Sequence, residues 1–149
     1  MKITTVGLDL AKALFQVHGV DEHGKAVVRK QLKRKDVLIY FAQLPPCRIG
    51  MEACGSAYHW ARKLMELGHE VRLMAPQFVK PYVKTNKSDR NDAEAICEAV
   101  SRPNMRFVPV KSPEKQAVLA LHRARQAMVK ARTAQANQIR GLVRINEFD

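Results

Sequence analysis

The segment TNKSDRNDAEAI (residues 85–96) carries two aspartates, Asp89 and Asp92, three positions apart at the start of an expected helix. Positions three apart share a helix face, and two carboxylates on one face repel each other unless a cation or a proton lies between them. A helix start also favours Ser and Asp as capping residues. The segment therefore predicts either a cap, with Ser88 or Asp89 at the N-cap and Asp92 folding back on it, or half of a metal site.

Two further acids stand where expected strands end. Asp9 is the last residue of the strand expected at residues 3–9, and Glu52 is the last residue of the strand expected at 47–52. If these strands are neighbours in a sheet, both side chains emerge at one edge, and the helix that begins at Asp89 can pack back toward it. Four carboxylates could then hold two hard divalent ions for phosphoryl transfer. The simpler interpretations are a strand-end turn for Asp9 and a helix cap for Glu52.

Hydrophobic patterning and breaker residues indicate the elements that would position these acids. Three strands with short links come first, as in an antiparallel meander, and strands then alternate with helices. The order βββαβαβα is that of the RNase H-like fold, an α/β mixed sheet flanked by helices, here with a long C-terminal helix. The expected strands are residues 3–9, 13–20, 25–32, 47–52 and 70–74, with a further possible strand at 106–110. The expected helices are 36–44, 56–68, 76–84, 89–100 and 112–146, and Pro81 must kink or end the third of them.

The charge of the chain points to a polyanionic partner. It has 26 Lys and Arg against 14 Asp and Glu, a formal charge of +12 and a pI near 10.0, and nucleic acid is the usual partner of such a surplus. The stretch RKQLKRK (29–35) is either a nucleic-acid contact or a solvated strand edge. The cations expected to bind nucleic acid are Lys12, Lys84, Lys87, Arg90, Arg123, Arg125, Lys130, Arg132 and Arg140.

Other classes of protein find little support in the sequence. The three cysteines form no CxxC pair, which argues against a disulfide framework and a zinc ribbon and favours a reducing cytoplasm. No apolar run approaches the length of a membrane span. No GxxxxGK[ST] loop is present, which argues against nucleotide hydrolysis. Tyr58, His59 and Trp60, near Glu52, could stack on a base, although core packing is the simpler interpretation for Trp60.

Three segments, GLDLAK (7–12), GMEACGSAYHW (50–60) and TNKSDRNDAEAI, closely resemble the DEDD transposases of the Piv/MooV type, the insertion sequence 110 family. The segment AQANQIRGL (134–142) resembles the end of that family's N-terminal region. The resemblance implies a transposase or recombinase whose RuvC-like domain covers residues 1–110, with Mg²⁺ (or Mn²⁺ as a substitute), DNA and an element-encoded guide RNA as its ligands in a bacterial cytoplasm. The catalytic and metal-binding acids that it implies are Asp9, Glu52, Asp89 and Asp92.

Residues 111–149 are then expected to be a basic helical extension at the start of a coiled-coil region. Leu121, Met128 and Leu142 are spaced by multiples of seven, with polar Gln135 between them, which favours a homo-oligomer through this helix over packing on the chain's own core. Family members continue into a C-terminal domain with a nucleophilic serine, which this sequence does not include. Complete recombination by this chain alone is therefore not expected.

Two other functions remain open at this stage. The basic surface could belong to a nucleic-acid-binding module without chemistry, in which the carboxylates are structural. Alternatively, the chain could be a RuvC-like Holliday-junction endonuclease, which shares the same carboxylate chemistry.

Overall fold

The computed structural model describes residues 2–84 and 88–146. The chain forms two compact units, Met1–Val110 and Lys111–Asp149. The second consists of one long helix, α5 (Pro113–Asn146). No helix in the described part of the chain is both long and apolar enough to cross a membrane.

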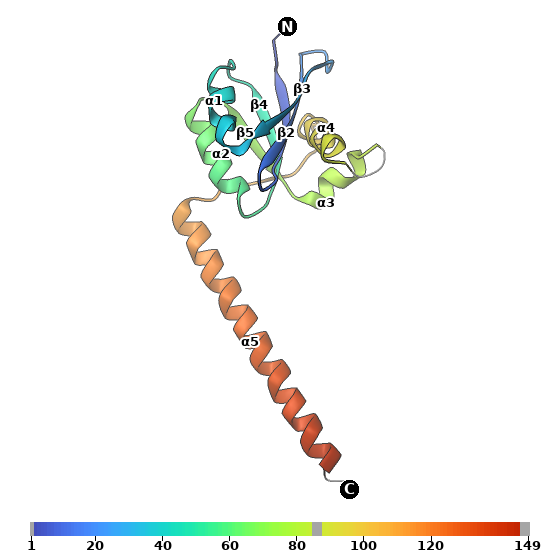
Figure 1. The fold of residues 1–149 in the computed structure, drawn as a ribbon, viewed down its shortest axis with the longest axis vertical. Helices are drawn as coiled ribbons and strands as arrows, with labels where there is room; N and C mark the ends of the chain where they lie inside the picture. The colour runs from blue at the N-terminus through green and yellow to red at the C-terminus, as the bar shows by residue number, and fades with distance from the viewer. Residues whose placement is uncertain (1, 85–87, 147–149) are drawn as a thin grey trace. The chain divides into compact units, whose positions relative to one another are not determined.

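The first unit is built on a six-stranded mixed sheet with the order β3-β2-β1-β4-β5-β6 (Figure 1). The first three strands pair antiparallel, which confirms the expected meander, and β4 and β5 then run parallel to β1. The last strand adds an antiparallel edge of two residues, shorter than expected. The strands are β1 (Thr5–Asp9), β2 (Leu14–Val20), β3 (Ala26–Lys33), β4 (Arg48–Glu52), β5 (Glu70–Met74) and β6 (Phe107–Val108).

Helices cover both faces of this sheet, with α1 and α2 on one side and α3 and α4 on the other (Figure 1). The helix expected at 76–84 is interrupted, because Pro81 has no N–H to continue the helical hydrogen bonds; a 3₁₀ turn, Lys80–Tyr82, follows α3. The helices are α1 (Val37–Ala42, preceded by a 3₁₀ turn at Arg34–Asp36), α2 (Ala57–Glu66), α3 (Pro76–Val79) and α4 (Asp89–Val100).

Alternation along β1 divides its side chains between the two faces. Val6 and Leu8 are fully buried in the larger core under α1 and α2, together with Phe41 and Leu64. Gly7 faces α4, because neighbouring residues of a strand point to opposite faces. Residues of α3, α4 and the end of β5 form a second, smaller core on that side: Met74, Val79, Ala95, Ile96, Ala99 and Val100.

The contact between α4 and β1 is close enough to require glycine. A Cβ atom at residue 7 would lie 2.1 Å from the backbone oxygen of Ala93 and 2.5 Å from the backbone nitrogen of Cys97. Beside it on β4, a Cβ atom at Gly50 would lie 2.7 Å from Cβ of Val100. Two glycines on neighbouring strands thus allow α4 to pack directly against the sheet.

Two histidines, His18 and His69, are buried in the first unit. Nε2 of His69 donates to the carbonyl oxygen of Phe41 at 2.9 Å, so its Nδ1 is free to accept from the backbone N–H of Cys47 at 3.2 Å. His69 thereby joins the end of α1 to the start of β4. His18, on β2 opposite Gly7, is only 5% exposed, and its Nδ1 has no hydrogen-bond partner within the described residues.

Replacing Gly7 by Ala should destabilise the fold by about 3 kcal/mol, the upper range for overpacked cores, because the atoms it would strike are backbone and cannot rotate away. Urea unfolding measures the loss. Gly55→Ala is the matched control, since nothing lies within 4 Å of the Cβ position there. Equal stabilities for the two variants would contradict the close contact.

His18 should make stability depend on pH. Burial lowers the pKa of His18 below its ordinary 6.5, Glu94 opposes the shift, and Arg29 and Lys84 add to it. Above pH 6.5 the residue is neutral in both states. As the pH falls below 6.5, the unfolded chain takes up the proton first, so the folded state loses stability, by at most about 1.4 kcal/mol per pH unit.

The free energy of unfolding between pH 7.5 and 5 tests this expectation. His18→Gln should lose less stability than the wild type over that range, whatever its stability at pH 7.5. His59→Gln, at an exposed histidine, is the matched control substitution. Parallel curves for His18→Gln and the wild type would show that the residue does not resist protonation.

Candidate active site

Asp9 and Glu52 lie at the ends of adjacent parallel strands. Gly7 of β1 pairs with Gly50 of β4, and both acids lie two residues further along their strands. The printed pairing ends at Gly7 and Gly50, and the same register carried two residues further would put Asp9 opposite Glu52. Residues two apart point to the same face, so both carboxylates are on the α4 side of the sheet. Both residues are half-buried.

The direction of α4 brings its first turn to the same edge. Sγ of Cys97 lies 3.8 Å from the carbonyl oxygen of Thr5, whereas Ala93, one turn earlier, lies over Gly7. Moving back along α4 therefore corresponds to moving forward along β1. The next turn back, which carries Asp89 and Asp92, begins at the Asp9 end of the strand. The helix runs over residues 89–100, as expected from the sequence.

The cap of α4 is made by serine. Oγ of Ser88 accepts a hydrogen bond from the backbone N–H of Asn91 at 3.3 Å. Asn91 consequently occupies the third helical position, from which a capping side chain folds back on the N-cap residue. Asp92 comes one position too late for that role. The expectation that Asp92 folds back as part of a capping box is therefore wrong, and its carboxylate is not needed to start the helix.

The four acids do not form a closed metal site in the structure as described. The side chain of Asp89 lies outside the described part, and elsewhere no three His, Cys, Asp or Glu side chains gather closely enough to hold an ion. The structure thus brings the backbone positions of Asp9, Glu52 and Asp92 to one edge without bringing a set of three carboxylates together.

Thiol chemistry can be set aside for two of the three cysteines. Burial raises the pKa of Cys47 to about 11 and that of Cys97 to about 12. The thiolate is the form of cysteine that attacks as a nucleophile, so neither residue is a nucleophile near neutral pH. Cys54 is exposed and belongs to no group of metal-binding side chains among the described residues.

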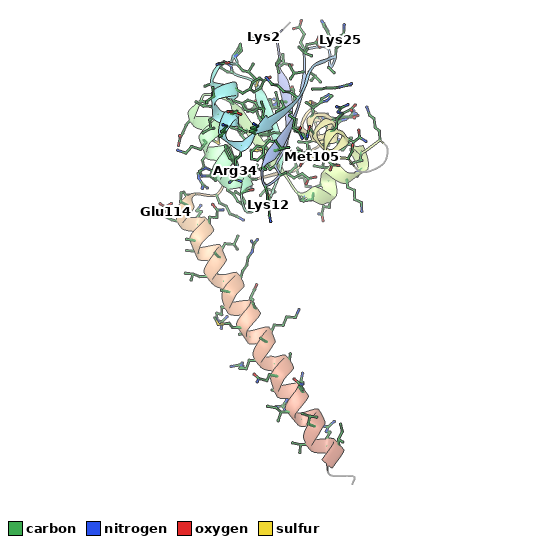
Figure 2. All side chains as sticks on the ribbon, viewed as in Figure 1. Lys2, Lys12, Lys25, Arg34, Met105 and Glu114 are labelled. Atoms are coloured by element: carbon green, nitrogen blue, oxygen red, sulfur yellow. The ribbon has the colours of Figure 1, made fainter. Side chains whose placement is uncertain are left out.

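The cations expected to bind nucleic acid have different surroundings. Lys12 is exposed between β1 and β2, and its carbonyl oxygen accepts from Arg34, which lies at the same end of the sheet (Figure 2). Lys84 pairs with Glu94 at 3.4 Å and Glu98 at 3.6 Å, so part of its charge is already balanced. The remaining cations of the set are exposed on α4 or α5 (Arg90, Arg123, Arg125, Lys130, Arg132 and Arg140), except Lys87, which lies outside the described residues.

Of the aromatic residues near Glu52, only one is open to a base. Trp60 is 6% exposed and packs edge-to-face on Phe15, with ring centroids 5.1 Å apart. Tyr58 is also buried, whereas His59 is exposed. Core packing is thus the role of Trp60, and base stacking by this segment would fall to His59.

Sequence reasoning missed polar residues on the strands next to Asp9. Gln16 pairs directly with Asp9 across β1 and β2, and Gln31 pairs with Gln16 on β3. The signal lay in the alternation of β2, where Gln16 and His18 fall on one face and Phe15 and Val17 on the other. Without the strand register, nothing connected these residues with the acids.

Comparisons with known sequences identify the family of the chain. Residues 6–145 match the family described as transposase, the DEDD type of insertion sequence IS110. A probable family 20 transposase of Pseudomonas aeruginosa is 64% identical over 143 residues, which are 96% of this chain and 42% of the relative. The transposase of insertion sequence element IS1111A of Coxiella burnetii is 50% identical over 95% of this chain, and that of IS1328 of Yersinia enterocolitica is 46% identical over 92%.

The chain spans about two fifths of the length of these relatives, 39% for the Coxiella protein and 41% for the Yersinia protein. Among solved structures, RuvC of T. thermophilus, determined in complex with a Holliday junction substrate, matches with a TM-score of 0.53. The match covers 72% of this chain and all of RuvC at 14% identity, and it shows the RNase H-like fold. The chain belongs to the DEDD transposase family of the IS110 type, of which it presents the RuvC-like domain.

Proposed function

We propose that this chain is the metal-dependent part of an insertion-sequence transposase, in which Asp9, Glu52, Asp89 and Asp92 are catalytic ligands for Mg²⁺. The observation that supports the proposal is the pairing of Gly7 on β1 with Gly50 on β4, because Asp9 and Glu52 each follow two residues later on the face that α4 covers. Because the chain corresponds to about two fifths of each relative, recombination itself is proposed for a protein of the relatives' full length.

The donor set fits a hard divalent cation. All four proposed ligands are carboxylates, which suit Mg²⁺ or its substitute Mn²⁺. Bound there, the ions would stabilise the attacking and leaving oxygens of a phosphoryl transfer. The protein would hold the ions through acids on well-defined elements. Asp9 and Glu52 are on paired strands, and Ser88 caps the helix that bears the other two acids.

The proposed partners are DNA and an element-encoded guide RNA, met in the bacterial cytoplasm. The charge of +12 supports a polyanionic partner, since Lys and Arg contacts to phosphates release counterions from the nucleic acid. On α5, Glu114 is the only acid, so this helix is suited to backbone contacts without reading sequence. Three free cysteines are compatible with a reducing compartment.

We also propose that α5 pairs with α5 of a second copy. Leu121, Met128 and Leu142 are 71%, 67% and 56% exposed, and their sevenfold spacing places them in one stripe. A helix of 34 residues extends over about 50 Å, which is long enough for several turns of contact. The cations between these positions remain available for phosphates.

A second function, binding of nucleic acid without chemistry, is favoured by one observation. Within the described residues, no three potential ligands are close enough to hold an ion. In that case the carboxylates would be structural. Cleavage of branched DNA by the isolated chain would instead favour a Holliday-junction endonuclease.

Asp9→Asn should weaken Mn²⁺ binding while the fold stays intact. Loss of an outer-shell partner of a metal ligand lowers affinity roughly 10–100-fold, and loss of a direct ligand should lower it further. Calorimetric titrations of the chain, with and without a short DNA, make the measurement. Asp36→Asn is the matched control, because Asp36 lies before α1 and makes no side-chain cap. If Asp9→Asn and the wild type bind Mn²⁺ equally in both conditions, the non-catalytic module is the better description.

The double variant Leu121→Glu, Met128→Glu should be monomeric at concentrations where the wild type is dimeric, because four like charges would meet in the paired stripe. Sedimentation equilibrium of the full chain measures the mass. Thr133→Glu, also exposed but away from the stripe, should leave the dimer intact. A wild-type chain that remains monomeric at all concentrations would rule out self-pairing.

A further inference from the structure

The sheet face that α4 covers becomes polar on β2 and β3. On β1 and β4 it presents glycines to the helix, but on β2 and β3 it presents polar side chains. The register pairs Gln16 with Gln31 and His18 with Arg29. Continuing the β1–β4 pairing gives a row that crosses four strands in the order Glu52, Asp9, Gln16, Gln31.

A hollow of about 190 Å³ lies over the β2–β3 part of this row. Its wall includes Gln16, His18, Arg29 and Gln31 from the two strands and Arg90 from the first turn of α4. Lys30 also borders it, although its ammonium group lies 4.8 Å from the ring centroid of Tyr40. Among the described residues, its wall contains no acid, and its two guanidinium groups give it a positive potential that favours an anion.

A buried ring nitrogen without a hydrogen-bond partner is a second indication that a ligand binds here. His18 borders this hollow and also a neighbouring hollow lined by Lys84, Glu94 and Glu98. It is only 5% exposed and leaves Nδ1 without a hydrogen-bond partner among the described residues. Such an atom costs about 1–3 kcal/mol, and a bound polar ligand would remove that cost. Arg29, its cross-strand partner, adds a planar fork that matches the oxygens of a phosphate.

The position of the hollow selects the ligand. Gln31 is two strand spacings from Asp9, about 10 Å, so a polynucleotide held at the carboxylates would reach the hollow within a short length of backbone. The volume is below the roughly 300–1,000 Å³ of pockets for drug-sized ligands. It therefore suits a phosphate with part of its sugar better than a free small molecule.

We propose that the hollow formed by Gln16, His18, Arg29, Gln31 and Arg90 binds a backbone phosphate of the DNA strand that is cut, close to the phosphate held at the acids. The inference rests on the proposed function for the identity of that strand. Arg29 and Arg90 bind the phosphate oxygens, and the two glutamine amides hold the adjoining sugar and phosphate. The strand is thereby directed along the row toward Asp9.

Two variants test the proposal by fluorescence anisotropy of a labelled single-stranded DNA, in EDTA so that no divalent ion contributes. Gln31→Glu places an acid in the hollow and should weaken binding about tenfold. Arg29→Gln should also lower the slope of log K against log salt by about 0.7, the value for one phosphate contact on a single strand. Both residues are exposed on β3, so the fold should persist, which circular dichroism checks.

The controls make the same chemical changes elsewhere. Gln77→Glu, on α3, and Lys25→Gln, in the turn between β2 and β3 at the end of the sheet opposite to Lys12 (Figure 2), should leave the affinity and the salt slope unchanged. If the hollow variants bind DNA as their controls do, the proposal is wrong. If only binding of an RNA of the same sequence weakens, the assignment to a DNA strand is wrong.

The Mn²⁺ titration of the same variants separates this inference from the proposed function. Arg29→Gln and Gln31→Glu should bind Mn²⁺ like the wild type when no DNA is present, because neither residue is among the four acids. If the hollow variants bind DNA more weakly in EDTA but the wild type binds no Mn²⁺, the phosphate site in the hollow is supported and the metal site is refuted. If the wild type binds Mn²⁺ but the hollow variants bind DNA normally, the metal site is supported and the phosphate site in the hollow is refuted.

Discussion

A Cβ atom at residue 7 would lie 2.1 Å from the backbone oxygen of Ala93, so β1 and α4 touch backbone to backbone at that point. The position of α4 along the strand is consequently fixed with little tolerance, since no side chain stands between them to adjust. The first turn of α4 then begins at the strand end that bears Asp9. The position of the first turn of α4 along β1 therefore depends on this contact.

Much of the fold was predictable because its signals are local. Periodicity and breakers located every helix and strand of the first unit, and the order of elements predicted the RNase H-like mixed sheet. Gly68, with φ of 91°, ends α2 as expected, because an L side chain rarely adopts that conformation. The interruption at Pro81 was visible in the sequence, but whether the proline would kink or end the helix depends on what packs around it.

The candidate site was predictable only where one residue type carried the signal. Asp9 and Glu52 stood out because an acid at the end of an apolar strand is conspicuous. Gln16, His18 and Gln31 did not, because their significance arises from pairing between strands, which sequence spacing does not encode. The capping role of Asp92 was likewise excluded only by geometry, because Ser88 bonds to Asn91; its role as a metal ligand stays a prediction.

The edges of the sheet have a consequence for how the chain behaves before it meets any ligand. β3 is one edge of the sheet, and such an edge can add a strand from another molecule and begin aggregation. Arg29, Lys30 and Lys33 give this edge a charge that a second copy would also carry, so two copies repel there. The opposite edge, β6, is only two residues long. Newly synthesised copies are thus protected at both edges from joining sheet to sheet.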